Sequence, residues 1–266
     1  MKKINNLGAI IALFAICISG CKKEDADLSG TFYGPSEAVG AASARAFVEL
    51  NAAGDPIMVG IQIDANALND LPDSLTSGGV YRLADGWTEY ALAFPAEAES
   101  SPFKHVTLDW NPFGHEPPGL YDVPHFDCHF YLISQDERLA IGENDTTEFA
   151  NAPDPSFIPA NYVPVPGGVP AMGAHWVDTT SAEFTGQPFT NTFIYGTYDG
   201  NVTFYEPMVS LDYLTTHVMG MGHDFRTDIP QPSNYHSSGL YPTQYAIEYD
   251  ADSEMYRVIL DSMIER

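Results

Sequence analysis

The sequence predicts a mostly β protein: a single antiparallel β-sandwich or barrel-like domain with long Pro/Gly-rich loops and few short helices. Short apolar or aromatic runs recur along the chain and are separated by turn residues, which is typical of this class. The 266 residues include 22 Gly, 20 Pro, 15 Phe, 15 Tyr and 3 Trp, and this composition favours strands and turns over helices. With 44% hydrophobic and 18% charged residues, the chain can bury a core, which excludes intrinsic disorder.

The first residues have the layout of a secretory signal. Two lysines precede an apolar stretch over residues 7–18, which is short for a membrane span. Ile18-Ser19-Gly20-Cys21 resembles the bacterial lipobox, in which the cysteine is acylated and becomes the first mature residue. We therefore expect a lipoprotein signal peptide over residues 1–20 and lipidation, for example with palmitate, at Cys21. The alternative is an ordinary secreted protein cleaved nearby, which leaves Cys21 as an odd thiol in an oxidising compartment.

Residues 21–30 are expected to form a flexible acidic tether. Its segment Lys22-Lys23-Glu24-Asp25-Ala26-Asp27 resembles the surface-export signal of bacterial outer-membrane lipoproteins. The alternative interpretation is a solvated linker. We expect a bacterial outer-membrane lipoprotein that is periplasmic or surface-exposed. From residue 31 onward no break in composition and no repeat is visible, so residues 31–266 are expected to form a single β-rich domain.

The elements of the domain follow from local patterns. Apolar runs at 44–50 and 56–63 flank a Gly- and Asp-containing loop and predict a hairpin. Asp64 is then expected to cap a helical turn over residues 65–71 that ends at Pro72. Further strands are expected at 87–94, 105–110 and 125–134, and two more hairpins at 190–198 with 202–207 and at 244–249 with 255–260. Residues 151–173 and 214–243 are expected to be long loops, which are often functional.

The charge balance excludes some partners. The chain has 11 Lys and Arg against 36 Asp and Glu, which gives a formal charge of -25. Such a surface repels phosphate backbones and anionic lipid headgroups, so nucleic acid is not expected as a partner. The sequence also lacks the nucleophile elbow, the P-loop, the full dinucleotide fingerprint and the zincin motif. Whether the protein is an enzyme stays open.

The densest polar signal lies in residues 114–131, where three His and several acids occur together. On a strand that begins at residue 125, alternation places His125, Asp127, His129 and Tyr131 on one face and Phe126, Cys128 and Phe130 on the other. The second face is expected to be core. The first must meet water, hydrogen-bond partners or a metal, because burying polar groups without partners is costly.

Downstream residues can complete a ligand set. His125, His129, His175 and Glu206 would suit one divalent transition metal, such as Zn, Fe, Mn or Ni. Residues i and i+4 of a flat strand lie about 13 Å apart, so His125 and His129 can share an ion only if the strand is bulged near Asp127.

His115 and Glu116 are expected at the rim of this site. If the site is catalytic, Glu116 or Asp127 is the candidate for moving a proton. The alternative is that the histidines are structural and line a polar cleft or a subunit contact.

A second His-containing segment offers a different metal. In an extended chain His217, Met219, Met221 and His223 would lie on one side, and thioether plus imidazole ligands favour copper. The alternative is that these methionines serve packing or a hinge in a Gly-rich loop.

Several short motifs in the sequence resemble those of a known family. The motifs are Gly114-His115-Glu116-Pro117, Pro124-His125-Phe126-Asp127, His129-Phe130-Tyr131, Met172-Gly173 with His175-Trp176, and Glu206-Pro207-Met208. Together they resemble the TTHB-type family, a domain of unknown function in secreted and lipidated bacterial proteins, over most of residues 40–260. The resemblance implies a β-rich, oligomeric, extracytoplasmic protein and no particular reaction.

Two functions of different classes remain. The first is a lipid-anchored, extracytoplasmic metal-binding protein, attached to the membrane through the lipid on Cys21. The second is a non-catalytic assembly or ligand-binding lipoprotein, in which aromatic residues form a homo-oligomer contact or a platform for a small molecule or glycan. Periplasmic copper handling is a third hypothesis.

Overall fold

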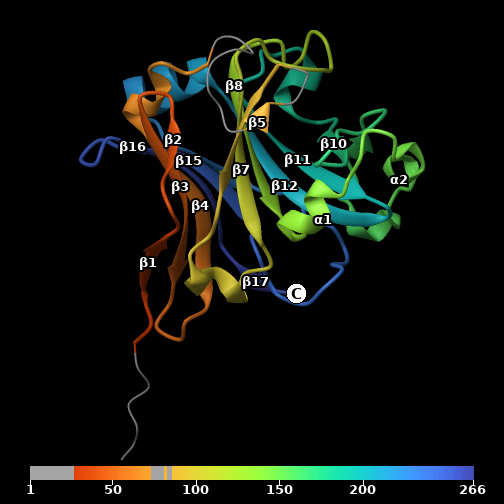
Figure 1. Cartoon of the computed structure of the whole chain (residues 1–266), viewed down its shortest axis with the longest axis horizontal. Helices are drawn as coiled ribbons and strands as arrows, with labels where there is room; N and C mark the ends of the chain where they lie inside the picture. The colour runs from red at the N-terminus through yellow and green to blue at the C-terminus, as the bar shows by residue number, and fades with distance from the viewer. Residues whose placement is uncertain (1–26, 73–80, 83–85) are drawn as a thin grey trace, which may run out of the picture.

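The computed structural model describes residues 27–72, 81–82 and 86–266. The expected signal peptide over residues 1–20, Cys21 and the tether up to residue 26 lie outside the described residues. Within them the chain forms two large antiparallel sheets that face each other, with short helices and loops on the far side of one sheet (Figure 1). The predicted mostly β class is confirmed, and the two sheets form an open, sandwich-like arrangement.

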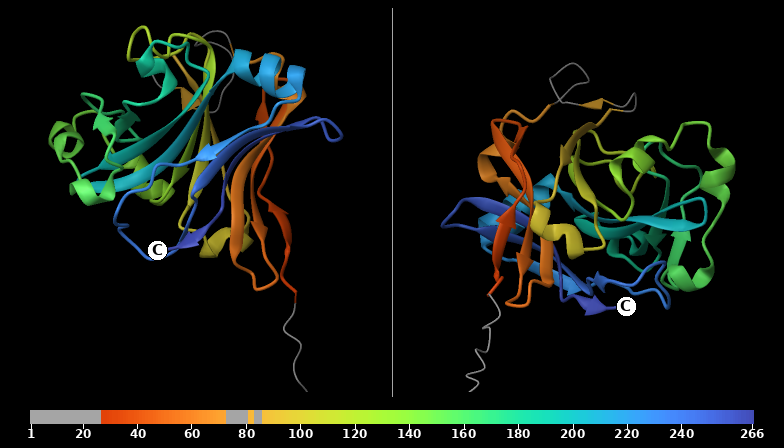
Figure 2. Two further views of the ribbon diagram at one scale, coloured as in Figure 1. Left: turned by 180° about the vertical axis from the view of Figure 1, so that it is seen from behind. Right: turned by 60° about the horizontal axis from the view of Figure 1, so that its bottom comes forward.

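The first sheet has the spatial order β1-β3-β4-β16-β15-β13, and β2 pairs with β3. Its strands are β1 (Gly30–Tyr33), β2 (Glu37–Val39), β3 (Ala42–Leu50), β4 (Pro56–Asp64), β13 (Phe225–Asp228), β15 (Gln244–Asp250) and β16 (Met255–Asp261). The N-terminal and C-terminal parts of the chain therefore meet where β4 pairs with β16 (Figure 2).

The second sheet has the spatial order β5-β6-β7-β8-β12-β11-β10-β9. Its strands are β5 (Tyr81–Arg82), β6 (Thr88–Leu92), β7 (His105–Asn111), β8 (His125–Tyr131), β9 (Tyr162–Pro164), β10 (Ala174–Asp178), β11 (Asn191–Tyr198) and β12 (Asn201–Ser210). Strand β8 is central, because β7 and β12 pair with its two edges. A small separate sheet pairs β14 (Leu240–Tyr241) with β17 (Ile264–Glu265).

The helices are all short. They are η1 (Ala65–Leu68), η2 (Ala96–Ser100), α1 (Gln135–Leu139), α2 (Thr146–Ala150), η3 (Pro155–Phe157), η4 (Ala182–Thr185) and η5 (Tyr213–Met219). Among the described residues, none of these helices has the length and apolar character needed to cross a bilayer.

The three predicted hairpins are confirmed, and the element ends differ for identifiable reasons. The Asp64 carboxylate accepts a hydrogen bond from the Asn66 backbone at 2.8 Å, as expected of a cap. The turn ends at Leu68 instead of residue 71, because Asn69 returns to an extended conformation. Strand β8 ends at Tyr131, because Ser134 forms a capping box with Glu137 and so begins α1.

Both expected loops contain short elements: η3 and β9 lie within residues 151–173, and most of η5, β13 and β14 lie within residues 214–243. Residues 213–219 form the π-helical segment η5, so the extended conformation on which the copper hypothesis depends is wrong. Leu214 and Val218 are four residues apart and both buried, and this spacing fits a helix that packs one face on the core. The Thr216 hydroxyl donates a hydrogen bond back to the Asp212 carbonyl at 2.6 Å, which supports the same turn.

The two faces of the second sheet differ in character. Its inner face contributes apolar side chains such as Leu108, Phe130 and Tyr205 to the core shared with the first sheet. Cys128 lies on this face as a buried free thiol, as predicted. The outer face carries buried polar side chains beside smaller apolar clusters, and it is covered by α1 and by loops that include α2 and η4 (Figures 1 and 2).

Candidate functional site

The outer face of β6, β7, β8 and β12 carries a buried layer of polar side chains. Strand alternation places them there, on the side opposite the apolar core. They are Glu89, His105, Thr107, Asp109, Asn111, His125, Asp127, His129 and Glu206. Among the residues whose side chains the structure describes, which do not include Arg82, Arg138 is the one buried Lys or Arg. Four carboxyl groups lie in this layer, and Arg138 forms its ion pair with Glu89. Burying charge without compensation is costly.

The register of the sheet decides which of these groups meet. Strands β7 and β8 pair without a shift, so Asp109 lies opposite Asp127. Strands β8 and β12 also keep one register on both sides of residue 206, which brings Glu206 level with His129. The bulge near Asp127 that a shared ion would require does not form. His125 and His129 consequently belong to two different clusters.

The first cluster contains three of the four expected metal ligands. His129, His175 and Glu206 come from β8, β10 and β12, and one ligand atom from each lies within 4.8 Å of the others. Nε2 of His129 lies 3.5 Å from Oε1 of Glu206, and Nε2 of His175 lies 3.7 Å from Oε2 of the same carboxylate. We name this group the His129 cluster.

These distances are long for hydrogen bonds and suit a shared ion. Nitrogen–oxygen hydrogen bonds are about 2.7–3.2 Å long, whereas ligand atoms on a tetrahedral ion with bonds of about 2.0–2.2 Å lie about 3.3–3.6 Å apart. Nε2 of His129 and Oε2 of Glu206 are buried and have no hydrogen-bond partner within the described part of the chain. A cation among the three side chains would satisfy both atoms.

The surroundings hold the two imidazoles in the neutral form that binds metals. Burial lowers the pKa of His129 to about 4 and that of His175 to about 3. Burial, together with the carboxylates of Asp127 and Asp109, raises the pKa of Glu206 well above its ordinary value. The carboxyl group would therefore give up a proton when a cation binds.

His129 is oriented from behind by groups that the sequence interpretation did not single out. Its Nδ1 lies 3.2 Å from Oδ2 of Asp109, which has no hydrogen-bond partner within the described residues, and 3.5 Å from Oγ1 of Thr107. A carboxylate behind the ring favours the proton on Nδ1 and leaves Nε2 free for a ligand. The alternation His105, Thr107, Asp109, Asn111 along residues 105–111 is the sequence signal that could have revealed this second polar strand.

The fourth expected ligand lies in a separate group. His125 gathers with His115 and Asp127, and one ligand atom from each again lies within 4.8 Å of the others. We name this group the Asp127 cluster. His115, which was expected at the rim of the predicted metal site, is thus a member of the Asp127 cluster. Of the two candidates for moving a proton, Glu116 is exposed, whereas Asp127 pairs with His115 and His125.

The alternative copper ligands do not converge. The ring of His217 stacks on Tyr213 at 5.1 Å between centroids, and Sδ of Met219 accepts a hydrogen bond from the Tyr256 hydroxyl at 3.2 Å. Met221 and His223 are exposed beyond the end of η5. Each residue therefore has a different environment.

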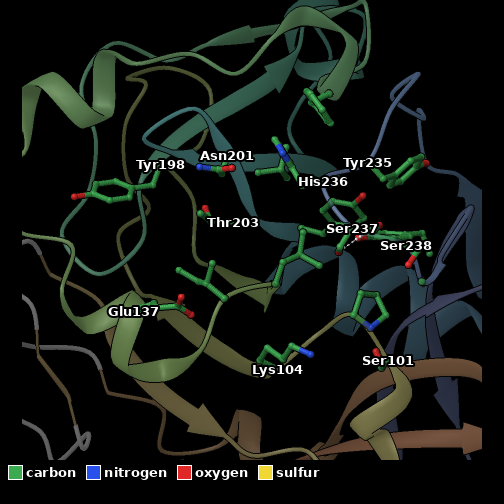
Figure 3. A pocket seen from close by; sticks show the side chains of 18 of the residues that line it. Ser101, Lys104, Glu137, Tyr198, Asn201, Thr203, Tyr235, His236, Ser237 and Ser238 are labelled. Atoms are coloured by element: carbon green, nitrogen blue, oxygen red, sulfur yellow. Dashed lines mark hydrogen bonds between the residues drawn. The ribbon is translucent and has the colours of Figure 1, made fainter. Parts of the chain in front are cut away.

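A cavity of about 810 Å³ lies apart from both clusters (Figure 3). Its walls combine Tyr198, Tyr205, Tyr235 and Tyr241 with polar groups that include Lys104. Its volume falls in the range of sites for small molecules, about 300–1,000 Å³. Neither cluster contributes a residue to its lining.

Comparison with known proteins gives one match. The searches of curated proteins and of solved structures returned no significant match. The family match ends at residue 110, before every motif on which the resemblance was based, so the two clusters lie outside the matched segment. Residues 51–110, from the end of β3 through most of β7, match the TTHB210-like family, described as hypothetical protein TTHB210.

Proposed function

We propose that this protein is a lipid-anchored, extracytoplasmic metal-binding protein whose domain holds one divalent transition ion at the His129 cluster. The observation that carries the proposal is the convergence of His129, His175 and Glu206, with a buried nitrogen and a buried oxygen that have no hydrogen-bond partner in the described residues. Two imidazoles and a carboxylate suit Zn, Fe or Mn.

The geometry suits a site that remains open to a further ligand. Three protein ligands leave a coordination position for water or a substrate oxygen. The side chain of His175 is 17% exposed, whereas those of His129 and Glu206 are each 1% exposed. An ion would therefore reach the cluster from the side of His175. When bound, such an ion polarises an oxygen or lowers the pKa of a water molecule.

Metal analysis of matched variants tests this proposal. A soluble form that begins after Cys21, purified without a His tag, is incubated with Zn²⁺, Fe²⁺, Mn²⁺ or Ni²⁺ in turn and analysed by elemental mass spectrometry. We expect His175→Ala and Glu206→Gln each to lose about one ion per chain. The exposed His223→Ala variant serves as the control and should keep it. Equal metal content in all four proteins would refute the site.

The lipid anchor is proposed on the lipobox-like sequence that ends at Cys21. In a bacterial host, the full chain should incorporate labelled palmitate and sediment with membranes. Cys21→Ser should lose the label and be released in soluble form. A Cys21→Ser chain that still carries the label would contradict acylation at this residue.

The cavity supports ligand binding as a second candidate function. Aromatic walls mixed with hydroxyl and amide groups suit a polar small molecule or a glycan. Tyr235 lines the cavity and is half-buried, so Tyr235→Ala can remove one wall without opening the core. If a glycan library detects a ligand, this variant should weaken its binding. A ligand that binds both proteins equally would rule out this cavity.

A further inference from the structure

We propose that His115, His125 and Asp127 form a second, separate site for one divalent transition cation of the Zn²⁺, Fe²⁺ or Mn²⁺ class. This inference goes beyond the proposed function and does not depend on it, because the two clusters share no ligand. The cation would bind two imidazole Nε2 atoms and the carboxylate of Asp127.

The first argument is the spacing of the three side chains. Nε2 of His115 lies 3.2 Å from Oδ2 of Asp127, and Nε2 of His125 lies 3.2 Å from Oδ1 of the same carboxylate. Ligand atoms that share a tetrahedral ion with bonds of about 2.0–2.1 Å lie about 3.3 Å apart. Both distances are close to that spacing, and the contact between His115 and Asp127 also has the geometry of a hydrogen bond.

The second argument is the orientation of the two rings. Nδ1 of His115 donates a hydrogen bond to the Glu116 carbonyl at 2.6 Å, and Nδ1 of His125 donates one to the Val123 carbonyl at 2.7 Å. In a neutral ring the proton is then on Nδ1, so the lone pair of Nε2 faces Asp127. A backbone carbonyl behind Nδ1 is the usual arrangement of a metal-bound histidine.

The third argument is a pair of buried atoms that lack partners. Nε2 of His125 and Oδ1 of Asp127 lie 3.2 Å apart, but neither forms a hydrogen bond with any group in the described residues. The side chain of His125 is 0% exposed and that of Asp127 is 7% exposed. Leaving two such atoms unsatisfied is costly, and a cation between them and His115 would satisfy both.

The surroundings are built to hold this cluster. The amide of Asn111 donates a hydrogen bond to Oδ2 of Asp127 at 2.8 Å, which fixes the carboxylate. The rings of Tyr121 and Phe189 lie against His125, with centroid distances of 6.5 and 5.5 Å. These apolar walls exclude water and so strengthen the attraction between a cation and its ligands.

The loop before β8 places His115 over the strand. Gly114 has a φ of +71°, and a Cβ at this position would lie 2.0 Å from the Tyr121 carbonyl oxygen. A glycine is thus needed for the loop to close onto residue 121. The His115 side chain is 33% exposed, which gives an ion a path from the surface to the buried pair.

Equilibrium dialysis with Zn²⁺ at neutral pH distinguishes the two clusters. In the soluble form that begins after Cys21, we expect two ions per chain. His115→Ala and Asp127→Asn should each bind one, and Glu206→Gln should also bind one. His115→Ala combined with Glu206→Gln should bind none. Both single variants should fold, because His115 is partly exposed and Asn is close to Asp in shape. An unchanged circular dichroism spectrum checks this.

The outcomes separate this inference from the proposed function. If His115→Ala and Asp127→Asn bind as much Zn²⁺ as the unmodified chain, the second site is refuted, and the histidines then form proton-mediated ion pairs with Asp127. If instead Glu206→Gln binds as much as the unmodified chain, the His129 site is refuted and the second site stands. Co²⁺ supplies an independent readout. Its visible absorption should fall by about half in each single-site variant, and an unchanged spectrum in His115→Ala would overturn the second site.

Discussion

At the scale of single residues, Asp109 determines how well His129 can bind a cation. Its carboxylate lies 3.2 Å behind Nδ1 of the ring, in the position from which such groups orient metal-bound histidines. Replacing this carboxyl group in Asp109→Asn should weaken Zn²⁺ binding at the His129 cluster about 10–100-fold. Competition with a fluorescent chelator measures this change. His223→Ala, at an exposed histidine, is the control and should leave the affinity as it is.

A second residue, His105, should make the fold sensitive to acid. Burial, and to a lesser extent the charge of Arg138, lowers the pKa of His105 to about 4 from an ordinary value of 6.5. The unfolded chain therefore binds more protons than the folded chain between these values, and stability falls as the pH drops from about 6.5 to about 4. The shift corresponds to a loss of up to about 3 kcal/mol.

His105→Phe preserves a ring that can stack on Tyr131, as His105 does at 4.6 Å, and it removes the titrating group. Urea unfolding at pH 7 and pH 4.5 should show a smaller acid loss in this variant than in the unmodified chain. His223→Gln should not reduce the loss. An identical pH dependence in His105→Phe would contradict the assignment.

At the scale of elements, α1 is joined to the second sheet by one buried ion pair. Arg138 donates two hydrogen bonds to Glu89 on β6, at 2.9 and 2.8 Å, and its side chain is 1% exposed. Removing one partner leaves a buried charge, so Arg138→Met should lower the free energy of unfolding by about 3–5 kcal/mol. Chemical denaturation measures it.

Arg138→Met combined with Glu89→Leu is the matched test of this pair. Because neither charge remains, the double variant should be more stable than Arg138→Met alone. A double variant that is less stable by the sum of the two single losses would show that the pair is not coupled.

The hairpin of β11 and β12 holds the His129 cluster through a close contact. Phe204 packs over Gly196, where an added Cβ would lie 2.0 Å from the ring. The same ring lies 4.9 Å from His129 and 5.1 Å from His175, between centroids. Gly196→Ala should cost about 1–3 kcal/mol by overpacking, and it should weaken metal binding at this cluster more than at the Asp127 cluster. Equal weakening at both clusters would contradict this role.

The limits of sequence reasoning also appear at this scale. Alternation within β8 correctly placed His125, Asp127 and His129 on one face, because that pattern is local. Which histidines share an ion depends on the register between β8 and β12 and on the path of the loop that carries His115. Both are long-range features, and a strand pattern does not encode them. The helix η5 was missed because Gly220 and Gly222 suggested a loop, whereas packing of Leu214 and Val218 on the core favours a helical turn.

At the scale of the whole molecule, the domain buries a layer of carboxyl groups beneath a negatively charged surface. The chain carries a formal charge of -25, and four carboxyl groups are buried on the outer face of the second sheet, where Arg138 forms an ion pair with Glu89. Cations bound at the two clusters should therefore stabilise the fold. At a free concentration of 100 times the dissociation constant, one ion contributes about 2.7 kcal/mol.

Thermal unfolding should report this linkage. For a chain of this size, about 2.7 kcal/mol corresponds to a rise in Tm of about 5–10 °C. Differential scanning calorimetry with Zn²⁺ and with a chelator measures it. Glu206→Gln and His115→Ala should each show a smaller rise than the unmodified chain, whereas His223→Ala should show the full rise.

The most direct test of the central claim is anomalous X-ray diffraction at the zinc edge from crystals of the soluble chain grown with Zn²⁺. The account predicts one anomalous peak among His129, His175 and Glu206 and a second among His115, His125 and Asp127. Zinc peaks confined to exposed carboxylates or crystal contacts, with none at either cluster, would contradict it.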